Sequence, residues 1–170
     1  NAERWGIDPA KIGIVGFSAG GHLASSAGTH FGKSPEDGSD PLAAVSCRPD
    51  FMVLVYPVIS MRDGITHSGS RRNLLGRSPG AGLVESMSNE EQVTSQTPPG
   101  FLVHSGDDTA VPVQNSLLFY RACLEANVPA ELHVFLKGGH GYGMRPEAGP
   151  AAGWPALCRG WLGELGILAE

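Results

Sequence analysis

Short apolar runs of strand length recur along the chain. They lie at 11–17, 51–57, 101–104 and 130–135 and are rich in β-branched and aromatic residues. The first two runs are apolar on both faces, which is typical of buried parallel strands, whereas 130–135 alternates and indicates a strand toward the edge. We therefore expect the 11–17 strand at the centre of a parallel sheet.

Stretches of helix length separate these runs. Small residues over 20–29 suit a helix that packs closely on a sheet, and apolar residues at helical spacing predict amphipathic helices over 113–126 and 154–165. Brief helical turns are expected at 71–75, 83–87 and 90–93, with Asn89 as a plausible cap, and a surface loop at 31–49. This alternation predicts one α/β domain over 1–170, with helices on both faces of a mostly parallel sheet.

Composition excludes several classes of protein. Hydrophobic residues make up 41% of the 170 residues and charged residues 17%, which excludes a disordered tail. The net charge is -5 and no basic cluster extends beyond Arg71 and Arg72, so we expect no nucleic-acid partner. No apolar run reaches the roughly 18 residues of a membrane helix, so no membrane span is expected.

Three cysteines are present, Cys47, Cys123 and Cys158, and their spacing matches no zinc motif. We expect reduced, partly buried thiols and no bound metal. One disulfide stays open as an alternative if the protein is exported.

The segment 16–20 reads G-x-S-x-G and stands between a predicted buried strand and a predicted helix. That setting is typical of a nucleophile elbow, a strained turn that presents a serine at the carboxyl end of the sheet. We expect neighbouring backbone to approach Gly16 and Gly20 closely, at positions where the Cβ of any other residue would clash. Ser18 would be the nucleophile, and the N–H of Ala19 would face a developing oxyanion.

A nucleophilic serine needs a base, and the glycine-rich segment that follows the last predicted strand supplies His140. A flexible loop there can extend over the sheet edge. His133 lies within a strand, and His22 and His104 are interpreted as structural hydrogen-bonding residues. His67 lies in a loop that could border a pocket.

The base needs a carboxylate that orients it, and two aspartates follow the third predicted strand. A carboxylate there would accept the Nδ1–H of His140 and leave Nε2 free for the serine proton. The resulting chain order, Ser18, Asp108, His140, is that of α/β-hydrolases.

Three stretches carry a resemblance to a known family: WGIDPAKIGIVGFSAGGHLAS, RPDFMVLVYPVISM and FLVHSGDDTAVPVQNSLLFYRACLEANVPAELHVFLKGGHGYG. The chain resembles the carboxyl-terminal part of an α/β-hydrolase, near the esterase and lipase group that includes acetyl-xylan esterases and related carbohydrate deacetylases. The family's D-x-x-V-P pattern implies that Asp108 is the acid, because Val111 and Pro112 follow it at the required spacing, and that Asp107 is a neighbour.

The resemblance also shows a departure. The His-Gly-Gly-type segment that normally supplies the second oxyanion donor does not occur in the sequence, and neither do the family's early strands. We expect a truncated chain that by itself folds poorly and hydrolyses little.

The resemblance implies a serine esterase without a cofactor that removes short acyl groups, acetyl above all, from a small-molecule or carbohydrate ester such as acetylated xylan. A prolyl-oligopeptidase-like serine peptidase is the alternative enzyme, and a non-catalytic binding protein of the same fold is the alternative class. Dienelactone hydrolases are disfavoured because they usually carry a cysteine nucleophile. Tyr56, His67 and Tyr142 are candidate pocket residues. The tryptophans are expected in the core: Trp5, Trp154 and Trp161.

Overall fold

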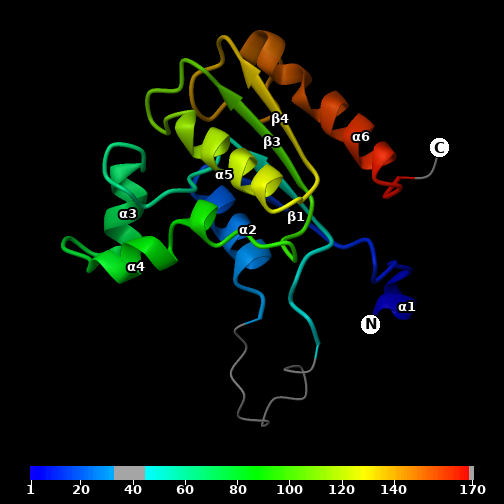
Figure 1. The fold of residues 1–170 in the computed structure, drawn as a ribbon. Helices are drawn as coiled ribbons and strands as arrows, with labels where there is room; N and C mark the ends of the chain where they lie inside the picture. The colour runs from blue at the N-terminus through cyan, green and yellow to red at the C-terminus, as the bar shows by residue number, and fades with distance from the viewer. Residues whose placement is uncertain (33–44, 169–170) are drawn as a thin grey trace.

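The computed structural model describes residues 1–32 and 45–168. Its centre is a four-stranded sheet in the order β1-β2-β3-β4, and each neighbouring pair is parallel (Figure 1). The strands are β1 (Gly13–Phe17), β2 (Phe51–Val55), β3 (Gly100–Ser105) and β4 (Ala130–Phe135). All four predicted strands therefore exist, and the prediction of a parallel sheet is confirmed.

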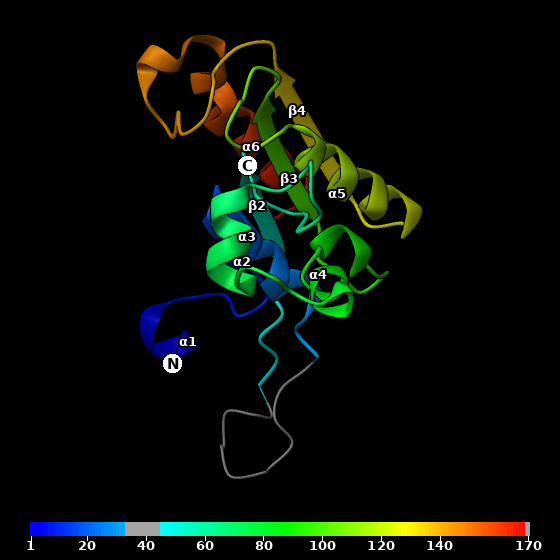
Figure 2. The same ribbon diagram turned by 90° about the vertical axis from the view of Figure 1, so that its left-hand side faces the viewer.

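Helices connect the strands and cover the sheet (Figure 2). Three long helices follow strands or the glycine loop: α2 (Ala19–Thr29), α5 (Gln114–Glu125) and α6 (Trp154–Glu164). Shorter helical segments complete the chain: α1 (Ala2–Trp5), α3 (Ser68–Leu75), α4 (Ala81–Ser86), η1 (Asn89–Glu91) and η2 (Pro146–Gly153). No helix among the described residues is long and apolar enough to cross a membrane.

Alternate residues of the inner strands enter two separate cores. Met52 and Leu54 of β2 pack with Ala24 of α2 and Phe119 of α5 on one face. Val53 and Val55 face the other way, into a cluster that includes the α6 side chains Trp154, Cys158 and Trp161. Both faces of β2 and β3 are therefore buried, which explains their continuous apolar runs. The expectation of helices on both faces is confirmed.

β1 departs from the prediction of a central, fully buried strand. It pairs with β2 alone among the described strands and forms one edge of the sheet. Val15 is 54% exposed and Phe17 is 38% exposed. An apolar sequence indicates that both faces of a strand are compatible with burial. It does not specify which segment of the protein covers those faces or pairs with the edge. The opposite edge is β4, as its alternating pattern predicts.

Smaller expectations meet mixed outcomes. Trp154 and Trp161 are buried, whereas Trp5 is 64% exposed, so its assignment to the core was wrong. Asn89 does not cap a helix through its side chain, which instead bonds the hydroxyls of α2 residues Ser25 and Ser26.

The cysteines are free thiols, Cys123 and Cys158 buried and Cys47 exposed. Most of the loop expected over 31–49 lies outside the described residues.

Candidate active site

The turn between β1 and α2 holds Ser18 in a conformation that L-residues rarely adopt, with φ 53° and ψ -120°. A Cβ on Gly16 would lie 2.2 Å from the carbonyl oxygen of Gly20, so the close approach expected at Gly16 exists. Gly20 itself has open space, and that part of the expectation was wrong. The second tight position is Gly21, where a Cβ would lie 2.5 Å from a side-chain atom of Pro57.

The loop after β4 carries the candidate base and depends on glycines for its shape. Gly139, Gly141 and Gly143 all have positive φ, at 61°, 75° and 55°. The carboxylate of Asp107 anchors the start of this loop, because its Oδ1 accepts the N–H groups of Gly138 at 3.0 Å and Gly139 at 2.8 Å. Sequence reasoning gave Asp107 no task, although its place beside the acid and opposite a glycine loop was a usable signal.

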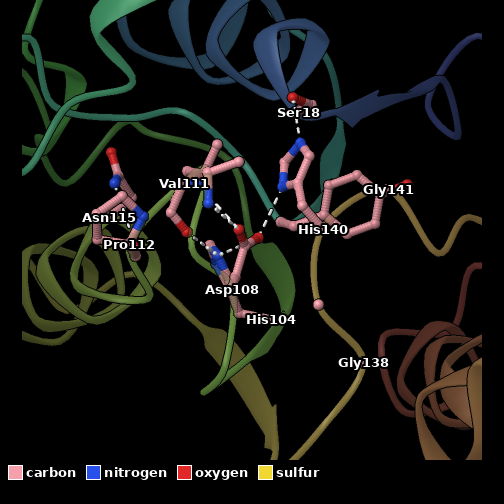
Figure 3. Close-up of polar contacts among 12 residues, drawn as sticks. Ser18, His104, Asp108, Val111, Pro112, Asn115, Gly138, His140 and Gly141 are labelled. Atoms are coloured by element: carbon pink, nitrogen blue, oxygen red, sulfur yellow. Dashed lines mark hydrogen bonds and ion pairs between the residues drawn. The ribbon is translucent and has the colours of Figure 1, made fainter.

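Ser18, His140 and Asp108 form a continuous hydrogen-bonded chain across the carboxyl edge of the sheet (Figure 3). The Ser18 Oγ lies 2.8 Å from Nε2 of His140, and Nδ1 of His140 lies 2.7 Å from Oδ2 of Asp108. Because a carboxylate only accepts, Nδ1 carries the proton of the neutral ring and Nε2 accepts from the serine hydroxyl. The three residues come from the loops after β1, β3 and β4.

The side chain of Asp108 has no exposed area and is held by its own turn. Its Oδ1 accepts the backbone N–H groups of Ala110 and Val111, each at 2.9 Å. These bonds satisfy the oxygen that does not face His140 and fix its position, which leaves Oδ2 to accept from the imidazole.

Two tyrosines pack beside the candidate base, Tyr56 in contact with His140 and Tyr142 in contact with Tyr56. Tyr56, which has φ 38°, places its ring edge-on against the imidazole with centroids 4.9 Å apart, and its hydroxyl accepts the N–H of Gly143 at 3.0 Å. Tyr142 packs against Tyr56 with centroids 4.6 Å apart. Both are buried, and burial raises the pKa of each phenol. In this structure they pack beside the candidate base, and their assignment to a substrate pocket stays a prediction.

A cavity of about 410 Å³ opens beside Ala19, the first residue of α2. The N–H of a first helical residue has no intrahelical acceptor, which leaves the Ala19 N–H available to a ligand. Apolar side chains dominate the cavity and include Leu23, Met61 and Met87. Sequence reasoning missed the two methionines, because only the folded loops bring them to α2.

The remaining histidines take structural positions. His67 does not line this cavity; its Nδ1 accepts the N–H of Ser70 and caps α3. His22 is buried, its Nε2 donates to the carbonyl of Met87, and burial lowers its pKa.

His133 on β4 pairs with Glu131. His104 is buried near Asp108 and bonds the hydroxyl of Ser116. The interpretation of His22 and His104 as structural hydrogen-bonding residues agrees with these contacts.

The parallel sheet, the strained serine turn and the order of the hydrogen-bonded loops define an α/β-hydrolase fold. Residues 1–123 match the sequence profile of the BD-FAE family. The chain belongs to the BD-FAE family.

The sequence is also similar to two curated proteins. The chain is 41% identical over 141 residues to endo-1,4-beta-xylanase B of Butyrivibrio fibrisolvens, covering 83% of this chain and 22% of that protein. It is 35% identical over 148 residues to an acetylxylan esterase of Xylanibacter ruminicola, covering 85% of this chain and 28% of that protein.

Two solved structures of esterases share this fold. An acetyl ester-xyloside bifunctional hydrolase from Caldicellulosiruptor lactoaceticus superposes with a TM-score of 0.93 at 47% identity, over 98% of this chain and 61% of that one. The carboxylesterase Cest-2923 from Lactobacillus plantarum superposes with a TM-score of 0.77 at 28% identity, over 99% and 64%. The chain therefore spans less than a third of the two curated relatives and less than two thirds of these two structures.

Proposed function

We propose that the chain is part of a serine hydrolase that cleaves carboxylic esters. The observation that carries the proposal is the chain of hydrogen bonds from Ser18 through His140 to Asp108. Names of relatives add to it, because they include an acetylxylan esterase, a carboxylesterase and an acetyl ester-xyloside hydrolase.

In the proposed mechanism the Ser18 Oγ attacks the ester carbonyl carbon while Nε2 of His140 takes the hydroxyl proton. Asp108 stabilises the imidazolium that forms. The carbonyl oxygen becomes an oxyanion beside the N–H of Ala19, where the N-terminus of α2 adds positive potential.

Collapse of this intermediate breaks the bond to the alcohol oxygen, which receives its proton from His140. A water molecule then gives a proton to His140 and attacks the acyl-enzyme. Release of the carboxylic acid returns the proton to Ser18. The chemistry uses only side chains and backbone of the protein, with no cofactor.

We further propose that the acyl group is short, acetyl above all, and that the alcohol is a sugar of xylan or another carbohydrate. The names of the relatives, which concern xylan and acetyl esters, support this step. We also propose that residues 1–170 form the carboxyl-terminal part of one α/β-hydrolase domain. The unpaired outer edge of β1 among the described strands and the greater length of the relatives support this arrangement.

The test compares wild type with Ser18→Ala in the full-length protein, on p-nitrophenyl acetate, butyrate and octanoate. We expect turnover of the acetate to fall by about 10⁴-fold or more, since loss of the nucleophile removes the covalent route. Ser78→Ala is the matched control, because this serine is exposed and outside the site. Turnover that persists in Ser18→Ala would contradict the proposal.

Two further substrates separate the alternatives. Preferential cleavage of an aminoacyl-proline amide over the acetate would indicate a peptidase. An inactive wild type whose Ser18 does not react with a fluorophosphonate probe would favour a binding protein. Release of acetate from acetylated xylan is the result expected for the carbohydrate ester.

A further inference from the structure

His104 is a buried titratable group that the mechanism above does not use. It is the penultimate residue of β3, four positions before Asp108, and its side chain has no exposed area. A fully buried imidazole next to a reacting carboxylate requires complete hydrogen bonding, because an unpaired polar group in this position is costly.

The contacts of His104 fix the position of its proton. Nε2 lies 2.9 Å from the carbonyl oxygen of Val111, which can only accept, so Nε2 carries the hydrogen. Nδ1 lies 2.8 Å from the hydroxyl of Ser116, which donates to it. Burial lowers the pKa of His104, which favours the neutral ring.

The same Nε2–H faces the catalytic candidate. Nε2 also lies 3.4 Å from Oδ2 of Asp108, so the N–H that donates to Val111 is close enough to the carboxylate to attract it electrostatically (Figure 3). Oδ2 is also the oxygen that accepts from His140 at 2.7 Å. One carboxylate oxygen is thus approached by two imidazole N–H groups, a short one from His140 and a longer one from His104.

We propose that His104 is a positioning residue of the esterase reaction: its Nε2–H donates to the Val111 carbonyl, attracts Oδ2 of the Asp108 carboxylate and thereby aligns the oxygen that orients His140. The inference rests on the proposed function of Ser18, His140 and Asp108. It goes beyond that function because His104 contacts neither substrate nor the reacting serine.

The geometry explains why two backbone bonds are not enough. The N–H groups of Ala110 and Val111 fix Oδ1, but rotation about the axis through Oδ1 can still move Oδ2. His104 supplies the third point, from the strand rather than from the loop itself. Because a misplacement of about 1 Å can cost about 100-fold in rate, the effect on turnover is expected to be large relative to the effect on substrate binding.

The test uses two amide replacements of different reach in the full-length protein. His104→Gln places its amide N–H where Nε2 stood, whereas His104→Asn is too short to reach Asp108 and keeps only the contact with Ser116. We expect His104→Asn to lower kcat by about 10- to 100-fold with KM nearly unchanged, and His104→Gln to recover most of that loss. Ser116→Ala is the matched control, because it removes a bond to Nδ1 of the same ring but leaves the Nε2–H beside Asp108 in place. It should lower Tm by a few degrees and leave kcat within about twofold.

A spectroscopic measurement on the wild type needs no variant to fold. In ¹⁵N-edited NMR of the imidazoles, His104 should be the Nε2–H tautomer and His140 should show a low-field Nδ1–H resonance. That resonance should broaden or move in His104→Asn and persist in His104→Gln and Ser116→Ala.

The outcomes are distinguishable. A wild type that is inactive, or a Ser18→Ala variant that stays active, overturns the proposed function. Turnover that depends on Ser18 but is equal in folded His104→Asn and wild type overturns only the role of His104. An Nδ1–H tautomer of His104 in the wild type overturns it as well.

Discussion

Two adjacent carboxylates after β3 hold two different partners. Asp108 turns inward and accepts from His140, whereas Asp107 accepts from the backbone of Gly138 and Gly139 at the root of the same loop. The first orients the imidazole, and the second fixes the loop that carries it. Neighbouring residues with the same chemistry thus control one histidine at two points.

This division leads to a prediction for Asp107. Replacement by Ala leaves two N–H groups without their acceptor and frees the glycine loop, so kcat should fall by about tenfold while Asp108 is untouched. Asp107→Asn keeps a side-chain oxygen in the same place and should lose much less. Steady-state kinetics on p-nitrophenyl acetate measures both, and equal rates in wild type and Asp107→Ala would refute the anchoring role.

Which residues would meet at the site was predictable from sequence to a large extent. The order of Ser18, Asp108 and His140 follows strands whose carboxyl ends share one edge of a parallel sheet, so their proximity follows from topology. The partners of Asp107 and His104 were not predictable, because they depend on how the turn between β3 and α5 directs each side chain.

At the scale of elements, the turn between β1 and α2 concentrates the close packing of the site. The carbonyl of Gly20 fills the space beside Gly16, while Gly21 lies against Pro57. The pentapeptide pattern indicates the turn but not which of its glycines is sterically required. The pattern contains both Gly16 and Gly20, but only Gly16 has neighbouring backbone where a Cβ would lie.

We therefore expect opposite results from two alanine substitutions in this turn. Gly16→Ala should destabilise the fold by about 1–3 kcal/mol or more, since the added Cβ meets backbone. Gly20→Ala should be neutral or raise stability by up to about 1 kcal/mol, because it enters open space at the start of a helix. Urea denaturation of the two variants measures this difference, and equal losses would contradict it.

The existence of elements was more predictable than their neighbours. The runs that became β2 and β3 are apolar throughout because two helical layers cover them. β1 has the same kind of sequence, yet it lies at an edge of the described sheet. The hydropathy of a strand indicates whether its faces are compatible with burial. Which strand lies beside it depends on segments far away in the chain.

At the scale of the whole molecule, the outer edge of β1 is exposed and unpaired among the described strands. Val15 and Phe17 are exposed there, next to backbone groups that no described strand pairs. Leu23 on the adjoining helix α2 is 70% exposed as well. Exposed apolar edge strands are templates for association between chains.

The 170-residue chain alone should consequently self-associate, and a charge on this edge should reduce the association. We expect Val15→Lys to shift the chain toward monomer in light scattering at fixed concentration. Leu124→Lys on α5 adds the same charge at a site that is 51% exposed and far from β1 in the sheet order, so it should have less effect. A wild-type chain that is monomeric over a wide concentration range would overturn the prediction.

The long separation between the site residues also ties chemistry to the order of folding. Ser18 and His140 are 122 residues apart in the chain, and the loop closure that joins them depends on β4 docking on β3. A folding intermediate with native helices but an undocked fourth strand would hold Ser18, the proposed nucleophile, apart from His140, the proposed base. Recovery of turnover after denaturation would then report when β4 docks on β3, so hydrolysis of the substrate measures the rate of that step of folding.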